Sequence, residues 1–203
     1  CCRKNIVKYT LKAFSFIPQI KDSLILDMGC GTGETDMALL EAYNCKIIAV
    51  DEDKECVSIL KSKVRNTTFG DRIKVIHGSI YEKELLNDQF DIVLAEGLLN
   101  IIGFEKGLPL LLKNLKQTGY LIIHDEMAND AYKRTLFEKY ALKITGTLEL
   151  DENIWWNEYY SCLERLISST DGGSHFNEIN EITEYKMDPG KCKSIIYILK
   201  HSI

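Results

Sequence analysis

The chain has 203 residues, of which 45% are hydrophobic, and a formal net charge of −5 at pH 7. This length and composition predict one domain with a complete core. The acidic balance, without any lysine- or arginine-rich run, argues against nucleic acid as a partner. No stretch approaches about eighteen consecutive apolar residues, so we expect no membrane span. The first residue is Cys1 rather than methionine, and we expect that a few residues precede it.

Hydrophobic patterning predicts an alternation of strands and helices, which is typical of an α/β fold with a parallel sheet and helices on both faces. We expect an amphipathic helix over residues 5–20 that covers the ligand site. The predicted strands are 24–28, 46–51, 73–77, 90–95, 119–124, 142–150 and 194–200. The predicted helices between the first six strands are 33–43, 54–65, 82–86, 105–115 and 129–140.

The most informative segment is LILDMGCGTG, an apolar strand that ends in an acid and runs into a glycine-rich turn before a helix. Gly29, Gly31 and Gly33 can adopt positive φ and leave room for a ligand against the backbone. Asp27 lies at the carboxyl end of the strand, where open parallel sheets bind ligands. The turn of a dinucleotide dehydrogenase would need glycine where this chain has Glu34, so the spacing argues against that cofactor.

A second strand, KIIAVD, also ends in an acid. Asp51 is placed to accept hydrogen bonds from the ribose hydroxyls of a bound nucleoside. Glu52 is a close competitor, while Asp53 is predicted to cap the helix that follows. The alternative is that Asp51 is a solvated acid on a charged turn.

These residues resemble the class I S-adenosylmethionine-dependent methyltransferases, over nearly the whole chain and most closely from Leu24 to Asp51. The resemblance implies a single methyltransferase domain over 1–203, with S-adenosyl-L-methionine as cofactor and S-adenosyl-L-homocysteine as product. It also implies a Rossmann-like, mostly parallel sheet of seven strands in the order 3-2-1-4-5-7-6, with strand 7 antiparallel. The cofactor-binding positions carried over are Asp27, Gly29, Cys30, Gly31, Gly33, Asp51, Glu52, Ser79, Ile80 and Glu96. Ser79 stands where the family usually has Asp, which weakens the expected contact with adenine.

Two residues are candidate catalytic groups. Glu96 follows the fourth strand, in the segment that faces the reacting methyl group in the family, and is expected to be either a buried base with a shifted pKa or a cap for the next helix. His124 ends the fifth strand and is either a base near neutral pH or a hydrogen-bonded structural histidine. His77 is expected to be structural. No metal site is predicted, because the Cys and His spacings match none.

The last two strands are separated by residues 151–193, which are expected to form a helical insertion and a candidate substrate cap. This insertion resembles the W-x-x-E-Y-Y-x-x-L-E tail of a sub-group of small bacterial and archaeal methyltransferases, which tends to have Pro where Cys162 stands. Trp155, Tyr159 and Tyr160 are candidate substrate contacts. Their helical spacing equally favours packing inside the insertion.

The predicted function is methyl transfer to a small-molecule acceptor, in the cytoplasm, with reduced cysteines. Two alternatives stay open: a protein, peptide or RNA methyltransferase, and a non-catalytic module that binds the cofactor. An enzyme that methylates amino groups of DNA or RNA is disfavoured, because the fourth strand ends in AEGL instead of an Asn/Asp-Pro-Pro-aromatic run. The sequence identifies neither the acceptor nor its attacking atom, and it leaves a homodimer open.

Overall fold

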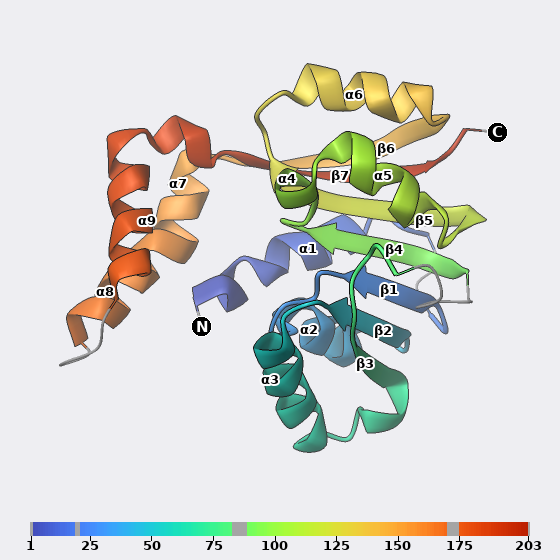
Figure 1. Ribbon diagram of the computed structural model, residues 1–203, viewed down its shortest axis with the longest axis horizontal. Coiled ribbons are helices and arrows are strands. Elements are labelled where there is room, and N and C mark those ends of the chain that lie inside the picture. The colour runs from blue at the N-terminus through green and yellow to red at the C-terminus, as the bar shows by residue number, and fades with distance from the viewer. Residues whose placement is uncertain (1, 19–20, 83–88, 170–174, 203) are drawn as a thin grey trace.

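The computed structural model describes residues 2–18, 21–82, 89–169 and 175–202. Within these residues, seven strands form one sheet in the order β3-β2-β1-β4-β5-β7-β6 (Figure 1). Neighbouring strands run parallel, except that β7 is antiparallel to both β5 and β6. The predicted fold class and strand order are therefore confirmed.

Most strand boundaries follow the hydrophobic pattern. The strands are β1 (Leu24–Met28), β2 (Lys46–Asp51), β3 (Ile73–His77), β4 (Phe90–Glu96), β5 (Leu115–Glu126), β6 (Leu142–Leu150) and β7 (Ser194–His201). Only β5 differs much from its prediction, because it begins four residues before Gly119. Its first residue, Leu115, pairs with Phe90 of β4, and the register shifts between Phe90 and Ile92. Because Leu115 belongs to the strand, the helix predicted over 105–115 ends earlier, at Leu112.

Helices cover both faces of the sheet (Figure 1). One core includes side chains of η1 (Cys2–Asn5), α1 (Val7–Phe14), α2 (Glu34–Ala42) and α3 (Lys54–Arg65). A short turn, η2 (Gly70–Arg72), precedes β3. The other core is formed with α4 (Leu99–Ile102), α5 (Phe104–Leu112) and α6 (Asp130–Lys139). Alternate residues of a strand face opposite sides, so Ile25 of β1 enters the first core and Leu26 the second.

The N-terminal helix is shorter than predicted. The amphipathic pattern suggested a single helix over 5–20, but α1 ends at Phe14, and the preceding residues form the separate turn η1. The predicted helix at 82–86 lies almost entirely outside the described residues.

The insertion between β6 and β7 is helical, as predicted. It consists of α7 (Glu152–Trp155), the π-helical turn η3 (Trp156–Tyr160), α8 (Ser161–Ser169), α9 (Phe176–Met187) and the short turn η4 (Pro189–Cys192). Figure 1 shows these helices at one end of the sheet, next to the N-terminal segment. We call this unit, residues 151–193, the cap. The sequence predicts a polar turn at 168–174 within this insertion, and most of that turn lies outside the described residues.

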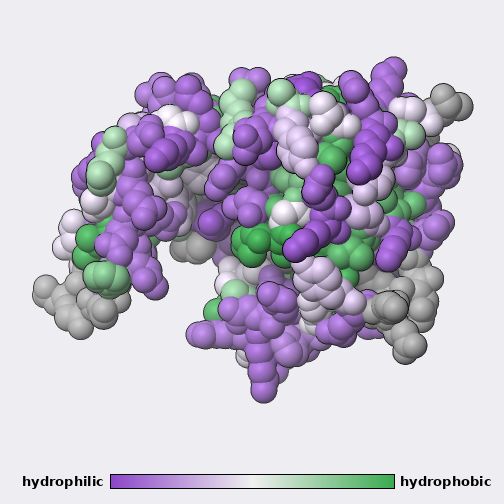
Figure 2. All heavy atoms as spheres, turned by 45° about the horizontal axis from the view of Figure 1, so that its top comes forward, coloured by the Kyte–Doolittle hydropathy of each residue, from purple (hydrophilic) through white to green (hydrophobic). Residues whose placement is uncertain are grey.

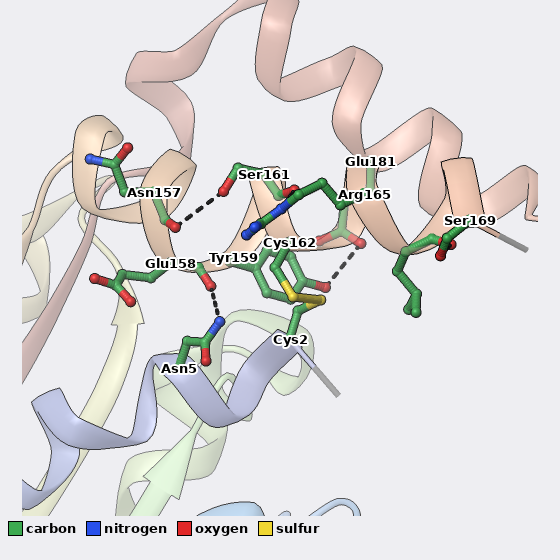
Figure 3. Close-up of a disulfide and its surroundings, with 11 residues drawn as sticks. Cys2, Asn5, Asn157, Glu158, Tyr159, Ser161, Cys162, Arg165, Ser169 and Glu181 are labelled. Atoms are coloured by element: carbon green, nitrogen blue, oxygen red, sulfur yellow. Dashed lines mark hydrogen bonds between the residues drawn. A yellow bond between two sulfur atoms is a disulfide. The ribbon is translucent and has the colours of Figure 1, made fainter.

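A disulfide joins the N-terminal segment to the cap, which corrects the expectation that the cysteines are reduced (Figure 3). Cys2 and Cys162 are 160 residues apart in sequence, yet their Cα atoms lie 5.7 Å apart. Asn5 Nδ2 donates to the carbonyl of Glu158 at 2.9 Å, and Lys8 forms an ion pair with the Glu158 side chain. The pairing depends on how the cap folds back onto η1, which cysteine spacing does not reveal.

Candidate functional site

A cavity of about 1150 Å³ lies between the carboxyl ends of the parallel strands and the cap. Figure 2 shows the molecule hollowed between the cap and the main body. The lining comes from the glycine turn, the ends of β4 and β5, the start of β7, the N-terminal segment and the cap. The location agrees with the general rule that open α/β sheets bind ligands outside the carboxyl ends of their strands.

The glycine turn forms the floor of this cavity, and two of its glycines are required for different reasons. Gly33 has φ of 75°, and a Cβ there would lie 2.2 Å from Cδ1 of Leu60, so α3 packs directly against the turn. Gly31 has φ of 54°, and an added Cβ would meet no described atom within 4 Å. The space beside the Gly31 backbone is therefore free of described atoms.

Asp51 holds the turn from the side. Its Oδ2 accepts a hydrogen bond from the backbone N–H of Gly31 at 2.7 Å, and its Oδ1 accepts one from the N–H of Asp53 at 2.8 Å. Asp53 caps α3 as predicted, because its side chain accepts from the N–H groups of Glu55 and Cys56. Each carboxylate oxygen of Asp51 thus accepts one backbone hydrogen bond, and each has a further lone pair that a ligand can use.

The other residues predicted to contact ribose and adenine gather at the tips of β2 and β3. Ser79 Oγ donates to Glu52 Oε2 at 3.2 Å, and His77 Nε2 lies 3.0 Å from the Glu52 carbonyl. Ile80 packs against the second core. Among the described residues, these side chains and Asp51 lie beside the cavity instead of in its lining. The structure thus separates the predicted cofactor site into two adjoining groups.

Two carboxyl groups are buried together under the glycine turn. Asp27 of β1 lines the cavity, and Asp36 of α2 lies beside it with no exposed surface. Burial raises the pKa of Asp36 to about 7. Burial, followed by the charge of Asp36, raises the pKa of Asp27 well above its usual value. Asp27 and Asp36 share a side-chain hydrogen bond, because burial keeps a proton on the pair. Beyond this pair, no donor of another described residue reaches Asp27 Oδ1 or either oxygen of Asp36.

Glu96 lies at the end of β4, on the same face of the sheet. Its Oε1 accepts from Thr10 Oγ1 at 2.5 Å and its Oε2 from Thr35 Oγ1 at 2.6 Å. Burial alone would raise the pKa of Glu96, but the hydrogen bond and charge of His124, together with the two threonines, outweigh it and lower that pKa. Glu96 is therefore an ionised carboxylate, and α4 begins at Leu99 without a side-chain cap from any described residue.

His124 lies opposite Glu96 in the β4–β5 register. Its Nδ1 is 3.5 Å from Glu96 Oε1, and its Nε2 is 2.9 Å from Ser194 Oγ at the start of β7. Ser194 also accepts a hydrogen bond from Trp155 Nε1 at 3.0 Å. Glu96, His124, Ser194 and Trp155 all line the cavity. Both candidate catalytic residues are thus brought together at the carboxyl edge of the sheet.

Sequence reasoning missed four residues that shape this site: Thr10, Thr35, Asp36 and Ser194. Thr35 and Asp36 carry a signal that could have found them, because two polar residues lie at inward positions of a helix that should be apolar there. Thr10 and Ser194 give no comparable signal, since one polar residue at a helix face or strand end is common. Their roles depend on which elements meet at the cavity.

The aromatic residues of the cap pack against one another and also reach the cavity. Tyr159 and Tyr160 are 8% and 7% exposed, with ring centroids 5.1 Å apart, so packing within the insertion is confirmed. Trp155 and Tyr160 line the cavity, whereas Tyr159 donates to Glu181 on α9. Cys30, another predicted residue, lines the cavity as a thiol whose pKa is raised by burial.

The fold and the site define a class I methyltransferase architecture. A profile of the methyltransferase domain family matches residues 20–166, and the chain belongs to this family. A crystal structure of a SAM-dependent methyltransferase from Geobacter sulfurreducens, in complex with S-adenosyl-L-homocysteine, is similar with a TM-score of 0.73 and 14% identity. That likeness covers 96% of this chain and 90% of the other.

Two curated relatives differ in what they methylate. A demethylmenaquinone methyltransferase from Bacteroides fragilis is 24% identical over 166 residues, which is 78% of this chain and 65% of that protein. A ribosomal RNA small subunit methyltransferase from Arabidopsis thaliana is 37% identical over 115 residues, or 55% of this chain and 30% of that protein. The chain therefore spans less than two thirds of the length of either relative.

The described residues show neither a membrane-spanning helix nor a metal site. Among the helices that the structure describes, none combines the length and apolar character needed to cross a bilayer. No three or more His, Cys, Asp or Glu side chains of the described residues are grouped as a metal ion would require.

Proposed function

We propose that the chain binds S-adenosylmethionine and transfers its methyl group to a small-molecule acceptor. The observation that carries the proposal is the cavity floor: a glycine turn with open backbone beside the buried Asp27–Asp36 carboxyl pair, which no donor of another described residue reaches at Asp27 Oδ1. A cationic amino-acid moiety would favour the ionised form of this buried pair and would donate to Asp27. Asp51 and Glu52, at the adjoining tip of β2, are the acids proposed to accept from the ribose, with Ser79 and Ile80 beside the adenine.

The bound cofactor would supply a sulfonium that is already a strong electrophile. The residues of this chain would align the acceptor with the methyl carbon and exclude water, which is largely a positioning effect. For an acceptor that arrives protonated, we propose His124 as the base, because it lines the cavity and faces the ionised carboxylate of Glu96. Such a carboxylate orients an imidazole and stabilises its charged form.

The size and composition of the cavity support a small acceptor. About 1150 Å³ would hold the cofactor together with a small molecule. The cap covers one side, and Trp155 and Tyr160 would contact the acceptor. A polynucleotide would need a basic surface, and this chain has a net charge of −5.

The test is transfer of a tritiated methyl group from labelled S-adenosylmethionine. The purified protein is offered three pools in parallel: a deproteinised small-molecule extract, total RNA and a protein extract. We expect label in the small-molecule pool. Label confined to RNA would support the alternative suggested by the ribosomal RNA relative, and label confined to protein would support a peptide acceptor. Cofactor binding by calorimetry without label in any pool would leave the non-catalytic module.

A further inference from the structure

A chain of hydrogen bonds runs from the cap to the floor of the cavity. Trp155 Nε1 lies 3.0 Å from Ser194 Oγ, and Ser194 Oγ lies 2.9 Å from His124 Nε2. On its other side, His124 Nδ1 lies 3.5 Å from Glu96 Oε1. Ser194 and His124 are 5% and 8% exposed, so these bonds are largely shielded from water.

The chemistry of the partners fixes the direction of each bond. An indole N–H only donates, so Ser194 Oγ accepts from Trp155. His124 Nδ1 faces an ionised carboxylate, and a lone pair there would meet negative charge, so in the neutral ring Nδ1 carries the proton. Nε2 is then an acceptor, and it receives the hydroxyl proton of Ser194.

This arrangement provides a route from the cavity to the imidazole through Ser194. Both nitrogens of His124 have partners, Glu96 on one side and Ser194 on the other. Ser194 Oγ accepts from Trp155 and donates to His124, and one lone pair of its oxygen is left. Ser194 is among the residues that line the cavity, so this lone pair is the position at which we place the proton of an acceptor.

We infer that Ser194 is a further catalytic residue, which passes the proton of the acceptor to His124. The inference rests on the proposed methyl transfer and adds to it the group that contacts the acceptor proton. Trp155, which orients the Ser194 hydroxyl from the cap, acts as a positioning residue.

The step balances within the site. The acceptor X–H bond breaks, its proton moves to Ser194 Oγ, and the original hydroxyl proton moves to His124 Nε2. The electron pair left on X forms the bond to the methyl carbon, while the electrons of the carbon–sulfur bond remain on sulfur. The imidazolium that results keeps its Nδ1–H toward the negative charge of Glu96. Ser194 ends the step as a hydroxyl, and no oxidant or reductant is needed.

The relay also connects the cap to the base. Trp155 is the last residue of α7, and its ring stacks on His124 with centroids 6.2 Å apart. The Ser194 hydroxyl is therefore oriented by a residue of the same unit that closes the cavity. Loss of the indole N–H should lower turnover without removing the base.

The experiment compares the native protein with Ser194→Ala and Ser194→Thr. Transfer of tritiated methyl to a deproteinised small-molecule extract is measured from about pH 6 to about pH 9. Near pH 7 we expect Ser194→Ala to lose at least about tenfold in rate. The loss should shrink as the pH rises, because an acceptor that ionises in solution needs no relay. Ser194→Thr keeps the hydroxyl and should recover most of the rate.

A second readout needs no turnover. The ring nitrogen chemical shifts of His124, measured by NMR in the protein without cofactor, report which nitrogen carries the proton. We expect the Nδ1–H tautomer in the native protein and a mixture of tautomers in Ser194→Ala. Binding of S-adenosylhomocysteine by calorimetry checks that the variant folds, and Ser161→Ala, a cap serine that donates to the Asn157 carbonyl, is the matched control.

Three outcomes would overturn the inference. Native-like transfer by Ser194→Ala at every pH would remove the relay. A loss of rate that is independent of pH and is not recovered by Ser194→Thr would show a structural role only. An Nε2–H tautomer in the native protein would reverse the direction of the bonds. Absence of transfer by the native protein would instead remove the proposed function itself.

Discussion

The carboxylate of Asp51 holds the local backbone and is also the proposed ribose contact. Both of its oxygens accept backbone N–H groups, one from the glycine turn and one from the residue that caps α3. Charge-assisted hydrogen bonds of this kind contribute roughly 1.5–3 kcal/mol each. The side chain that is proposed to hold the ribose therefore also holds the loop on which the cofactor would lie. Glu52 is exposed and its carboxylate receives only the Ser79 hydroxyl among the described residues, so it carries no such structural role.

Replacement of Asp51 by alanine should weaken binding of S-adenosylmethionine by at least about tenfold, which corresponds to roughly 1.4 kcal/mol. Both the ribose contact and the Gly31 N–H contact would be lost. Titration calorimetry measures the change, and Glu52→Ala is the matched control with an expected smaller effect. Unchanged affinity in Asp51→Ala would remove the ribose assignment, and a larger loss in Glu52→Ala would move it to the neighbouring acid.

At the scale of elements, the N-terminal segment and the cap behave as two walls of one cavity. Residues of η1 and α1 line one side, and the cap lines another. The Cys2–Cys162 disulfide, the Asn5 hydrogen bond and the Lys8 ion pair hold these walls together. A covalent link across 160 residues restricts the unfolded chain strongly, so it should stabilise the fold as well as the cavity.

Without a reducing agent, Cys162→Ser should lower the free energy of unfolding by about 2–4 kcal/mol. With a reducing agent, the native protein and the variant should unfold at the same temperature. Cys56→Ser is the control, because Cys56 is a free thiol on α3. Thermal unfolding and thiol titration measure the effect. Identical unfolding of native protein and variant under oxidising conditions would mean that the bond does not form in solution.

At the scale of the whole molecule, the buried pair of Asp27 and Asp36 couples folding to pH. Burial raises the pKa of Asp36 from its ordinary value of 3.8 to about 7 in the folded protein. In the unfolded chain the same carboxyl loses its proton near pH 3.8, whereas in the folded protein it keeps the proton up to about pH 7. Between these two pH values the folded state binds more protons than the unfolded state. Stability contributed by this group is therefore largest at acidic pH and is lost as the pH rises toward about 7.

We expect the melting temperature of the protein without cofactor to fall between about pH 5 and about pH 8. Asp36→Asn removes a charge from a site without exposed surface and should reduce this slope. At about pH 8, Asp36→Asn should raise the free energy of unfolding by about 2 kcal/mol, which corresponds to a rise in melting temperature of roughly 4–8 °C. Asp71→Asn, at an exposed position, is the control. A slope in Asp36→Asn equal to the native one would contradict the assignment.

The sequence by itself determined the features whose cause is local. The alternation of apolar residues set the bounds of β1, β2, β3 and β6, and the acid at position 53 set the start of α3. The glycine spacing predicted a turn with positive φ, because glycine has no Cβ and adopts such a φ readily; Gly29, Gly31 and Gly33 all have it. The strand order followed from resemblance to a family, and the structure confirms it.

Only the tertiary structure decided which distant residues meet. Ser194 lies 70 residues after His124, and Cys162 lies 160 residues after Cys2. Glu96 owes its lowered pKa to His124 and to threonines of two helices, none of which lies near it in sequence. These contacts arise because the cap and the N-terminal segment fold over one edge of the sheet. The burial and the charges of side chains at that edge depend on packing between elements. The residue pattern within a single element does not predict that packing.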